Sequence, residues 1–162
     1  MMRIGYLGPR GTFTEAAVRT YIAREEFTNP VLVAHRTIAE VLLGVAAEEL
    51  QLGVVPAENS IEGSVVLTLD YLVHEVNLPI VGEVIIPVSH NLLALPGADP
   101  GEVIGVYSHP HALAQCRYHL SEMLPEAEAY PCHSTAEAAK IVRDKADPRL
   151  VAVGTELAAE LY

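Results

Sequence analysis

Positive charge is scarce in this sequence. It holds 10 Lys and Arg residues against 21 Asp and Glu residues, which gives a net charge of −11 at pH 7 and a pI near 4.9. The cations are scattered singly, whereas a surface that binds nucleic acid needs a basic patch to meet the phosphates. The composition therefore excludes nucleic acid as a partner. An anionic small molecule would have to be held by backbone N–H groups, helix N-termini and a few selected cations, because the overall field repels it.

Cysteines and long apolar runs are also few. The only cysteines, Cys116 and Cys132, each lie in a segment typical of regular structure, which favours buried thiols in a reducing compartment over a disulfide. The longest apolar stretch, residues 84–95, is interrupted by proline and polar residues and is shorter than the roughly 18 residues of a membrane helix. The apolar start of the chain meets glycine at once, which is typical of a first strand rather than a signal peptide. We therefore expect a soluble, cytoplasmic protein that has no membrane contact.

Apolar residues are plentiful, at 51% of the chain, and they alternate between strand-like and helix-like patterns. Each strand-like run precedes an amphipathic segment, which predicts βα units and a mainly parallel sheet. Three helix starts carry the capping pattern Ser/Thr-x-x-Glu, in which side chain and backbone satisfy each other's hydrogen bonds. The expected strands are residues 3–7, 31–34, 52–56, 103–107, 127–130 and 150–153, and the capping pairs are Thr12 with Glu15, Thr37 with Glu40, and Ser134 with Glu137.

The middle of the chain predicts a crossing between two lobes. A helix beginning near Ser64 places apolar residues from Val65 to Val73 on one face, which predicts a stripe buried against a sheet. Residues 78–95 then look strand-rich and lack a helical pattern, and residues 96–101 are typical of a turn or short linker. We therefore expect a first lobe over residues 1–78 and a second lobe over residues 79–162.

Three strand-to-helix turns, residues 8–14, 58–64 and 108–115, are richer in polar groups than a turn requires. In a parallel sheet such turns all lie at the carboxyl ends of the strands, where open α/β folds bind ligands. The first turn offers Gly8, Gly11 and free N–H groups to an anion, and is equally explained as a tight turn capped by Thr12. The second holds a carboxamide, two hydroxyls and two carboxylates, of which an Asx-type turn and an N-cap at Ser64 explain only part.

In the third turn, Pro110 suits the first position of a helix, and Ser108 or His109 is suited to cap it. Gln115 follows one turn later. His109 has a side chain whose pKa near neutrality suits a general acid, although histidines at such places more often cap or face solvent. The remaining histidines show no metal-ligand spacing among themselves or with the cysteines, and no nucleophile elbow supports a Ser-His-Asp triad. The sequence thus predicts no metal site.

Taken together, the polar turns resemble the prephenate dehydratase family. The family pattern GPxGTFT matches residues 8–14, VPxENSxEGSV-x-x-TLD-x-L matches residues 55–72, and SHPQALAQC matches residues 108–116 with His111 where glutamine is usual. STAEAA matches residues 134–139, and a helix resembling ELAAELYGL runs to Tyr162. The resemblance covers essentially the whole chain.

The resemblance implies a two-lobed α/β fold similar to type II periplasmic binding proteins, with homodimers or homotetramers as the usual assembly. It implies loss of water and carbon dioxide from prephenate to give phenylpyruvate, in L-phenylalanine biosynthesis, without cofactor or metal. It also implies a ligand cleft between the lobes. Carried over to this sequence, the substrate-binding residues are Thr12, Glu58, Asn59, Ser60, Ser64, Ser108 and Gln115, and the candidates for proton donor are His109 and Thr135.

One part of the family pattern is missing. Family members carry a Thr-Arg-Phe motif, whose threonine is implicated in protonating the leaving hydroxyl, and commonly an ACT domain, and neither is found in these 162 residues. The last helix also reaches Tyr162 without a terminating residue, so we expect a segment returning to the first lobe to be missing. Three interpretations stay open: an enzyme region that is inactive in this form, a binding or regulatory module that retains the cleft, and an altered lyase acting on prephenate or arogenate.

Overall fold

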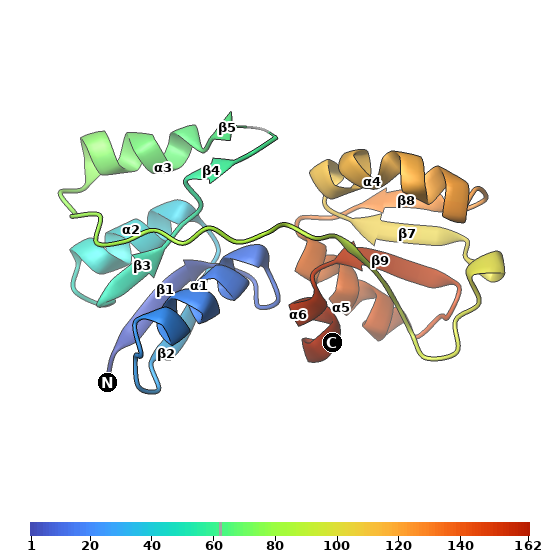
Figure 1. The fold of residues 1–162 in the computed structure, drawn as a ribbon, viewed down its shortest axis with the longest axis horizontal. Helices are drawn as coiled ribbons and strands as arrows, with labels where there is room; N and C mark the ends of the chain where they lie inside the picture. Colours follow the sequence, from blue (N-terminus) through green and yellow to red (C-terminus); the bar gives the residue numbers. More distant parts are fainter. Residues whose placement is uncertain (62) are drawn as a thin grey trace. The chain divides into compact units, whose positions relative to one another are not determined.

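Two α/β units make up the chain in the computed structural model, which describes residues 1–61 and 63–162 (Figure 1). Unit 1 comprises residues 1–9 and 13–87, and unit 2 comprises residues 10–12 and 88–162. The boundary therefore lies later than residue 78. The reason is that Gly82 lies against the ring of Tyr21 and the Arg24 guanidinium donates to the Glu83 carbonyl at 2.8 Å, so this stretch stays with unit 1.

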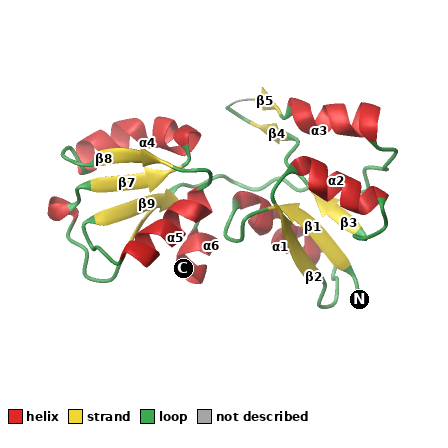
Figure 2. Ribbon diagram, turned by 180° about the vertical axis from the view of Figure 1, so that it is seen from behind, coloured by secondary structure: helices red, strands yellow, loops and turns green. Residues whose placement is uncertain are grey.

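The sheet of unit 1 is parallel and has the order β2-β1-β3, formed by β2 (Val31–His35), β1 (Arg3–Leu7) and β3 (Leu52–Val54). Helix α1 (Phe13–Arg24) packs through Val18 on the face that carries Ile4 and Tyr6. Helix α2 (Ile38–Ala46) packs on the opposite face, where a Cβ on Gly53 would lie 2.8 Å from Val41. Glycine in β3 therefore allows the close approach of α2, and the two helices sandwich the sheet (Figure 2).

The rest of unit 1 begins with a short antiparallel hairpin, β4 (Glu58–Asn59) and β5 (Gly63–Ser64), followed by α3 (Val66–Asp70) and a turn of π-helix, η1 (Tyr71–Glu75). The expected helix is present, but the expected buried stripe is wrong: Val66 is 65% exposed and Val73 is 71% exposed. The buried residue of α3 is Thr68, whose hydroxyl donates to the Pro56 carbonyl at 2.7 Å. This hydrogen bond links α3 to the chain that precedes it.

The sheet of unit 2 is mixed, in the order β6-β9-β7-β8. Strands β7 (Gly105–Ser108), β8 (Glu128–Pro131) and β9 (Leu150–Gly154) are parallel, and β6 (Asn91–Ala94) runs antiparallel beside β9. Helix α4 (Pro110–Met123) packs on the face of Val106 and Val151, and α5 (Thr135–Lys145) packs on the face of Ala152. Helix α6 (Glu156–Leu161) packs on α5, and a short 3₁₀ turn, η2 (Pro100–Glu102), lies in the predicted turn region. The predicted βα alternation is thus confirmed in both units.

The helix starts at Thr37 and Ser134 are capped as predicted: each hydroxyl accepts from the N–H three residues on, at 3.1 and 3.0 Å. The returning carboxylates of Glu40 and Glu137 accept from the residue before the cap in both cases. Glu15 is 1% exposed and accepts from Arg19 and from the Tyr6 hydroxyl. In the described part of the chain, no helix combines the length and apolarity needed to cross a membrane.

Candidate functional site

The carboxyl edge of the unit 2 sheet gathers most of the predicted site residues. Strands β7, β8 and β9 are parallel and end at Ser108, Pro131 and Gly154, so the turns that follow them lie at one edge. Strand β6 starts there too, because Asn91 pairs with Gly154. Of the three polar turns predicted to share one edge, only residues 108–115 directly follow a strand of this sheet, whereas the turns at residues 8–14 and 58–64 come after β1 and β3 of the unit 1 sheet, so the expectation of a single sheet edge is wrong.

Two hydroxyls at this edge are buried and hold the backbone together. Ser108 is fully buried and its hydroxyl donates to the Val153 carbonyl at 2.7 Å, which joins β7 to β9. Thr155 caps α6 by accepting from the Ala158 N–H at 2.9 Å, and it donates to the Gly11 carbonyl at 2.6 Å. A role for Ser108 in substrate binding remains a prediction. In the structure its hydroxyl forms a hydrogen bond between two strands.

The first polar turn is anchored on this same edge. Gly11 has φ +81°, and a Cβ there would lie 3.1 Å from the backbone of Ala158 and 3.4 Å from Ala136, so the position requires glycine. The Tyr162 hydroxyl adds a 3.3 Å bond to the Arg10 carbonyl. Residues 10–12 therefore belong to unit 2, and they bring half-buried Thr12 to the edge that carries Thr135 and Thr155.

The start of α4 carries a group of histidines and a carboxamide. His109 is the N-cap, and its Nδ1 accepts from the His111 N–H at 3.3 Å, so the proton of the neutral ring is on Nε2. The rings of His109 and His111 meet edge to face with centroids 4.9 Å apart. Gln115, one turn beyond His111, is exposed, and its Oε1 lies 2.9 Å from Nε2 of half-buried His90.

The start of α5 supplies Thr135, which is 9% exposed and follows the N-cap Ser134. The nearby Cys132 thiol is no nucleophile at neutral pH: burial, with the Glu137 carboxylate adding to it, raises the pKa of Cys132 to about 11. Burial also raises the pKa of Cys116. In residues 1–61 and 63–162, no group of three or more His, Cys, Asp or Glu side chains is arranged to hold a metal ion.

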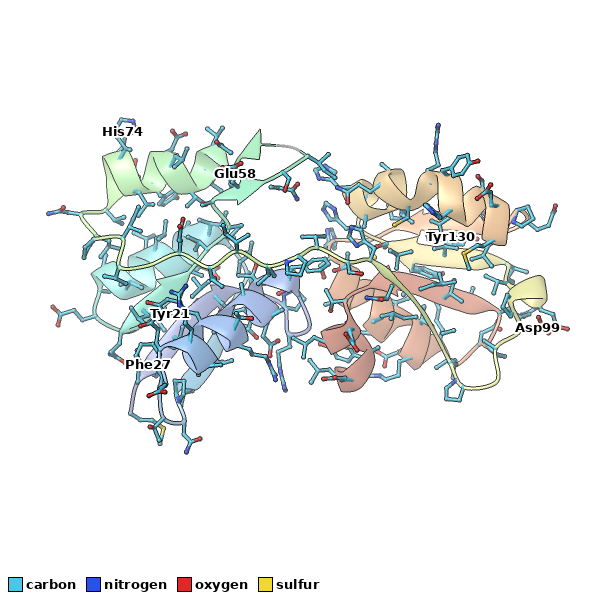
Figure 3. The ribbon with its side chains drawn as sticks, in the orientation of Figure 1. Tyr21, Phe27, Glu58, His74, Asp99 and Tyr130 are labelled. Atoms are coloured by element: carbon cyan, nitrogen blue, oxygen red, sulfur yellow. The ribbon has the colours of Figure 1, made fainter. Side chains whose placement is uncertain are left out.

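The remaining candidates lie on the β4–β5 hairpin of unit 1. Asn59 is half-buried and its Oδ1 accepts from the Ile61 N–H at 2.9 Å, so the Asx-type turn is present. The N-cap at Ser64, the other part of that structural alternative, is not formed: Ser64 lies in β5, and the N-cap of α3 is Val65, without a side-chain bond. Glu58, labelled in Figure 3, and Ser60 are exposed, and Glu62 lies outside the described residues.

Sequence reasoning missed two residues of the unit 2 edge. Thr155 had a signal, because a threonine directly after a strand and before a helix is a preferred N-cap. No local sequence signal pointed to His90, since its hydrogen-bond partner Gln115 is 25 positions away in sequence. Only the antiparallel direction of β6 brings it to the carboxyl ends of the other strands.

Comparison with known proteins agrees with this arrangement. The family model "Prephenate dehydratase" matches residues 4–162. This chain belongs to the prephenate dehydratase family. Its relatives include the prephenate dehydratase of Bacillus subtilis, 41% identical over 164 residues that cover 99% of this chain and 56% of the relative, and that of Lactococcus lactis strain IL1403, 37% identical over 161 residues that cover 55% of it. The chain thus spans about half the length of these relatives.

Solved structures give the same fold. Prephenate dehydratase from Arthrobacter aurescens, determined in complex with L-Phe, is 33% identical, with a TM-score of 0.88 over 99% of this chain and 52% of that chain. GqqA, described as a novel type of quorum-quenching acylase, is 31% identical with a TM-score of 0.84 over 99% of this chain and 56% of its own. The two-unit α/β architecture, similar to type II periplasmic binding proteins, is therefore the architecture of the family.

Proposed function

We propose that this chain is the prephenate-binding region of a prephenate dehydratase that acts in L-phenylalanine biosynthesis. The family match over residues 4–162 carries this proposal. The reaction consumes the prephenate dianion and one proton and releases phenylpyruvate, carbon dioxide and water. Aromatisation drives it, so the protein has to position the substrate and supply one proton rather than provide a strong base.

The polar edge of unit 2 supports this division of labour. It offers hydrogen-bond donors and helix starts at Thr12, His109, Gln115 and Thr135, which suit an anionic ligand in a chain whose net charge is −11. His109 and Thr135 are the candidates for the proton donor, and His109 can donate a proton only as the imidazolium, in which Nδ1 no longer accepts from the His111 N–H. Unit 1 would contribute the substrate-binding residues Glu58, Asn59, Ser60 and Ser64. Ser108 would contribute by holding β7 to β9 at the edge of the sheet. The expected assembly is a homodimer or homotetramer in the cytoplasm.

Two measurements on the 162-residue chain test the proposal. Calorimetry should detect prephenate binding, and an assay that follows phenylpyruvate by its absorbance in alkali should find turnover at least about 100-fold below an ordinary rate of about 10 per second. The low rate is expected because the Thr-Arg-Phe motif is not among these residues. Turnover at an ordinary rate would show that His109, Thr135 or another residue of this chain supplies the proton. Absence of prephenate binding would count against the whole proposal.

Asn59 offers a matched test of the binding role. Asn59→Asp keeps the oxygen that accepts from Ile61 but replaces the amide donor with a carboxylate, so prephenate binding should weaken by about 1 to 3 kcal/mol with little change in folding. His74→Ala, on the exposed side of η1 (Figure 3), should leave binding unchanged. Equal losses from both variants, measured by calorimetry on folded protein, would indicate general destabilisation instead of a binding role.

A second candidate function comes from the likeness to GqqA. An acylase hydrolyses an amide, which needs an activated water or nucleophile, and the raised pKa of Cys132 and of Cys116 makes their thiolates scarcer at neutral pH, which counts against either thiol in that role. Release of a carboxylic acid from an N-acylated amine is the assay for it. Hydrolysis without prephenate binding would favour this second function.

A further inference from the structure

The carboxamide of Gln115 is held in one orientation by a histidine from another strand. Nε2 of His90 lies 2.9 Å from Oε1 of Gln115. A carboxamide oxygen only accepts hydrogen bonds, so the imidazole nitrogen must carry the proton and donate it. This pairing requires the Nε2–H tautomer of His90, and with that tautomer the oxygen end of the amide faces the ring.

The consequence falls on the other end of the amide. A glutamine that is free to turn presents an oxygen or an NH₂ group equally well, because rotation about its last bond exchanges them. With Oε1 engaged by His90, the Gln115 side chain presents its two N–H donors. Gln115 is exposed, so these donors are available to a ligand acceptor.

The location makes this orientation useful. His90 immediately precedes β6, whose first residue, Asn91, pairs with Gly154 at the carboxyl end of β9. Gln115 lies in the second turn of α4, whose N-cap is His109. Both partners therefore lie at the polar edge of unit 2, and a fixed pair of N–H donors there is suited to a carboxylate oxygen.

We propose that His90 is a positioning residue: it donates to Oε1 of Gln115 and so aims the Gln115 amide N–H groups at a carboxylate of the bound substrate. The role rests on the proposed function in that the carboxylate is one of the two carried by prephenate. His90 itself does not touch the ligand. Its contribution is to remove the wrong amide orientation before binding, which lowers the cost of ordering the side chain.

A double-mutant cycle with a conservative rescue tests the proposal, with prephenate binding measured by calorimetry on the 162-residue chain. His90→Leu should raise the Kd about fivefold, the effect of losing one modest hydrogen bond. His90→Gln, whose amide nitrogen can replace Nε2–H, should return to within about twofold of the original Kd. In a Gln115→Leu background, His90→Leu should change the Kd by less than about twofold, because the side chain that it positions is gone. A full fivefold loss in that background, or no rescue by His90→Gln, would overturn the positioning role.

Nitrogen NMR of the ligand-free protein separates this proposal from the proposed function. The His90 ring should carry its proton on Nε2, and the Gln115 side-chain N–H₂ signals should broaden or shift in His90→Leu but not in His90→Gln. A proton on Nδ1 of the neutral ring would overturn the positioning role even if prephenate binds. If prephenate does not bind the original chain, the proposed function fails, while the NMR result still decides how His90 orients Gln115.

Discussion

The two units differ in how completely they cover their apolar side chains. In unit 2, α4 and α5 cover both faces of the sheet, and α6 closes over α5. In unit 1, α1 and α2 cover the sheet, but the segment after it exposes a run of large apolar side chains. These are Ile61, Val66, Leu67, Leu69, Val73, Ile80, Val81 and Ile85.

This difference shows what an apolar sequence pattern can predict. The pattern identifies side chains that are suited to burial, but it does not identify the surface that buries them. Residues 65–73 have the spacing of a core-facing helix, and in this chain Thr68 is the buried residue of α3 while Val66, Leu69 and Val73 are exposed. An exposed apolar surface of this kind favours self-association. Unit 2, by contrast, completes its core from residues within the chain.

The largest expected effect separates the covered and uncovered parts of unit 1. Ile4→Ala removes a fully buried side chain next to Tyr6 and Val18, so the free energy of unfolding should fall by about 3 to 4 kcal/mol. Val66→Ala in α3 should change it by less than about 0.5 kcal/mol, because Val66 is 65% exposed. Urea unfolding followed by circular dichroism measures both. A loss above about 1 kcal/mol for Val66→Ala would mean that another surface covers α3 in solution, and solution mass would then reveal a second copy.

A smaller effect compares helix caps in the two units. Thr155→Val removes the bond to the Gly11 carbonyl and the cap on Ala158 while keeping the side-chain shape, and should cost about 2 kcal/mol because both groups are buried. Thr37→Val removes an exposed cap of α2 in unit 1 and should cost about 1 kcal/mol. Equal losses in urea unfolding would show that the Gly11 contact adds nothing.

The sequence predicted the local structure well because its signals are local. Strands β1, β2, β3, β7, β8 and β9 were expected within about two residues, since apolar runs bounded by glycine and polar turns set them. The expectation that residues 78–95 are strand-rich is wrong, because the only strand in this stretch, all of which the structure describes, is β6 (Asn91–Ala94). The Thr37 and Ser134 caps followed from a three-residue pattern, and Asn59 formed the Asx-type turn that was one of its alternatives. The convergence of Ser108 and Thr135 on one edge followed from parallel strand direction alone.

What the sequence did not predict depends on contacts between distant residues. The attachment of residues 10–12 to unit 2 rests on the bond from Thr155, 144 positions away from Gly11. The burial of Ser108, the pairing of His90 with Gln115, and the exposure of Val66 likewise depend on which segments meet. The resemblance to the family identified the candidate site residues. It did not predict whether a hydroxyl such as that of Ser108 faces a ligand or bonds to a neighbouring strand.

The smallest effect uses the cysteines, both of which lie in unit 2 and so report on that unit alone. The pKa of Cys132 is raised to about 11 by burial and by Glu137, so at pH 8 its thiolate is rare, and alkylation should be more than about tenfold slower than in urea-unfolded chain. Because the folded pKa lies above the unfolded value, the thiol form stabilises unit 2 below pH 9, and this contribution is lost as the pH rises from about 9 to about 11. Cys132→Ala should flatten that decline.

The same alkylation rate decides whether the two units unfold independently. Thr155→Val weakens unit 2 directly and should speed the alkylation of Cys132, whereas Ile4→Ala weakens the core of unit 1 and should leave the rate unchanged if each unit is stabilised by its own core. Mass spectrometry of the Cys132 peptide, sampled over time at pH 8, measures the rate in each variant. Equal acceleration by Ile4→Ala would mean that the two units open together and not independently.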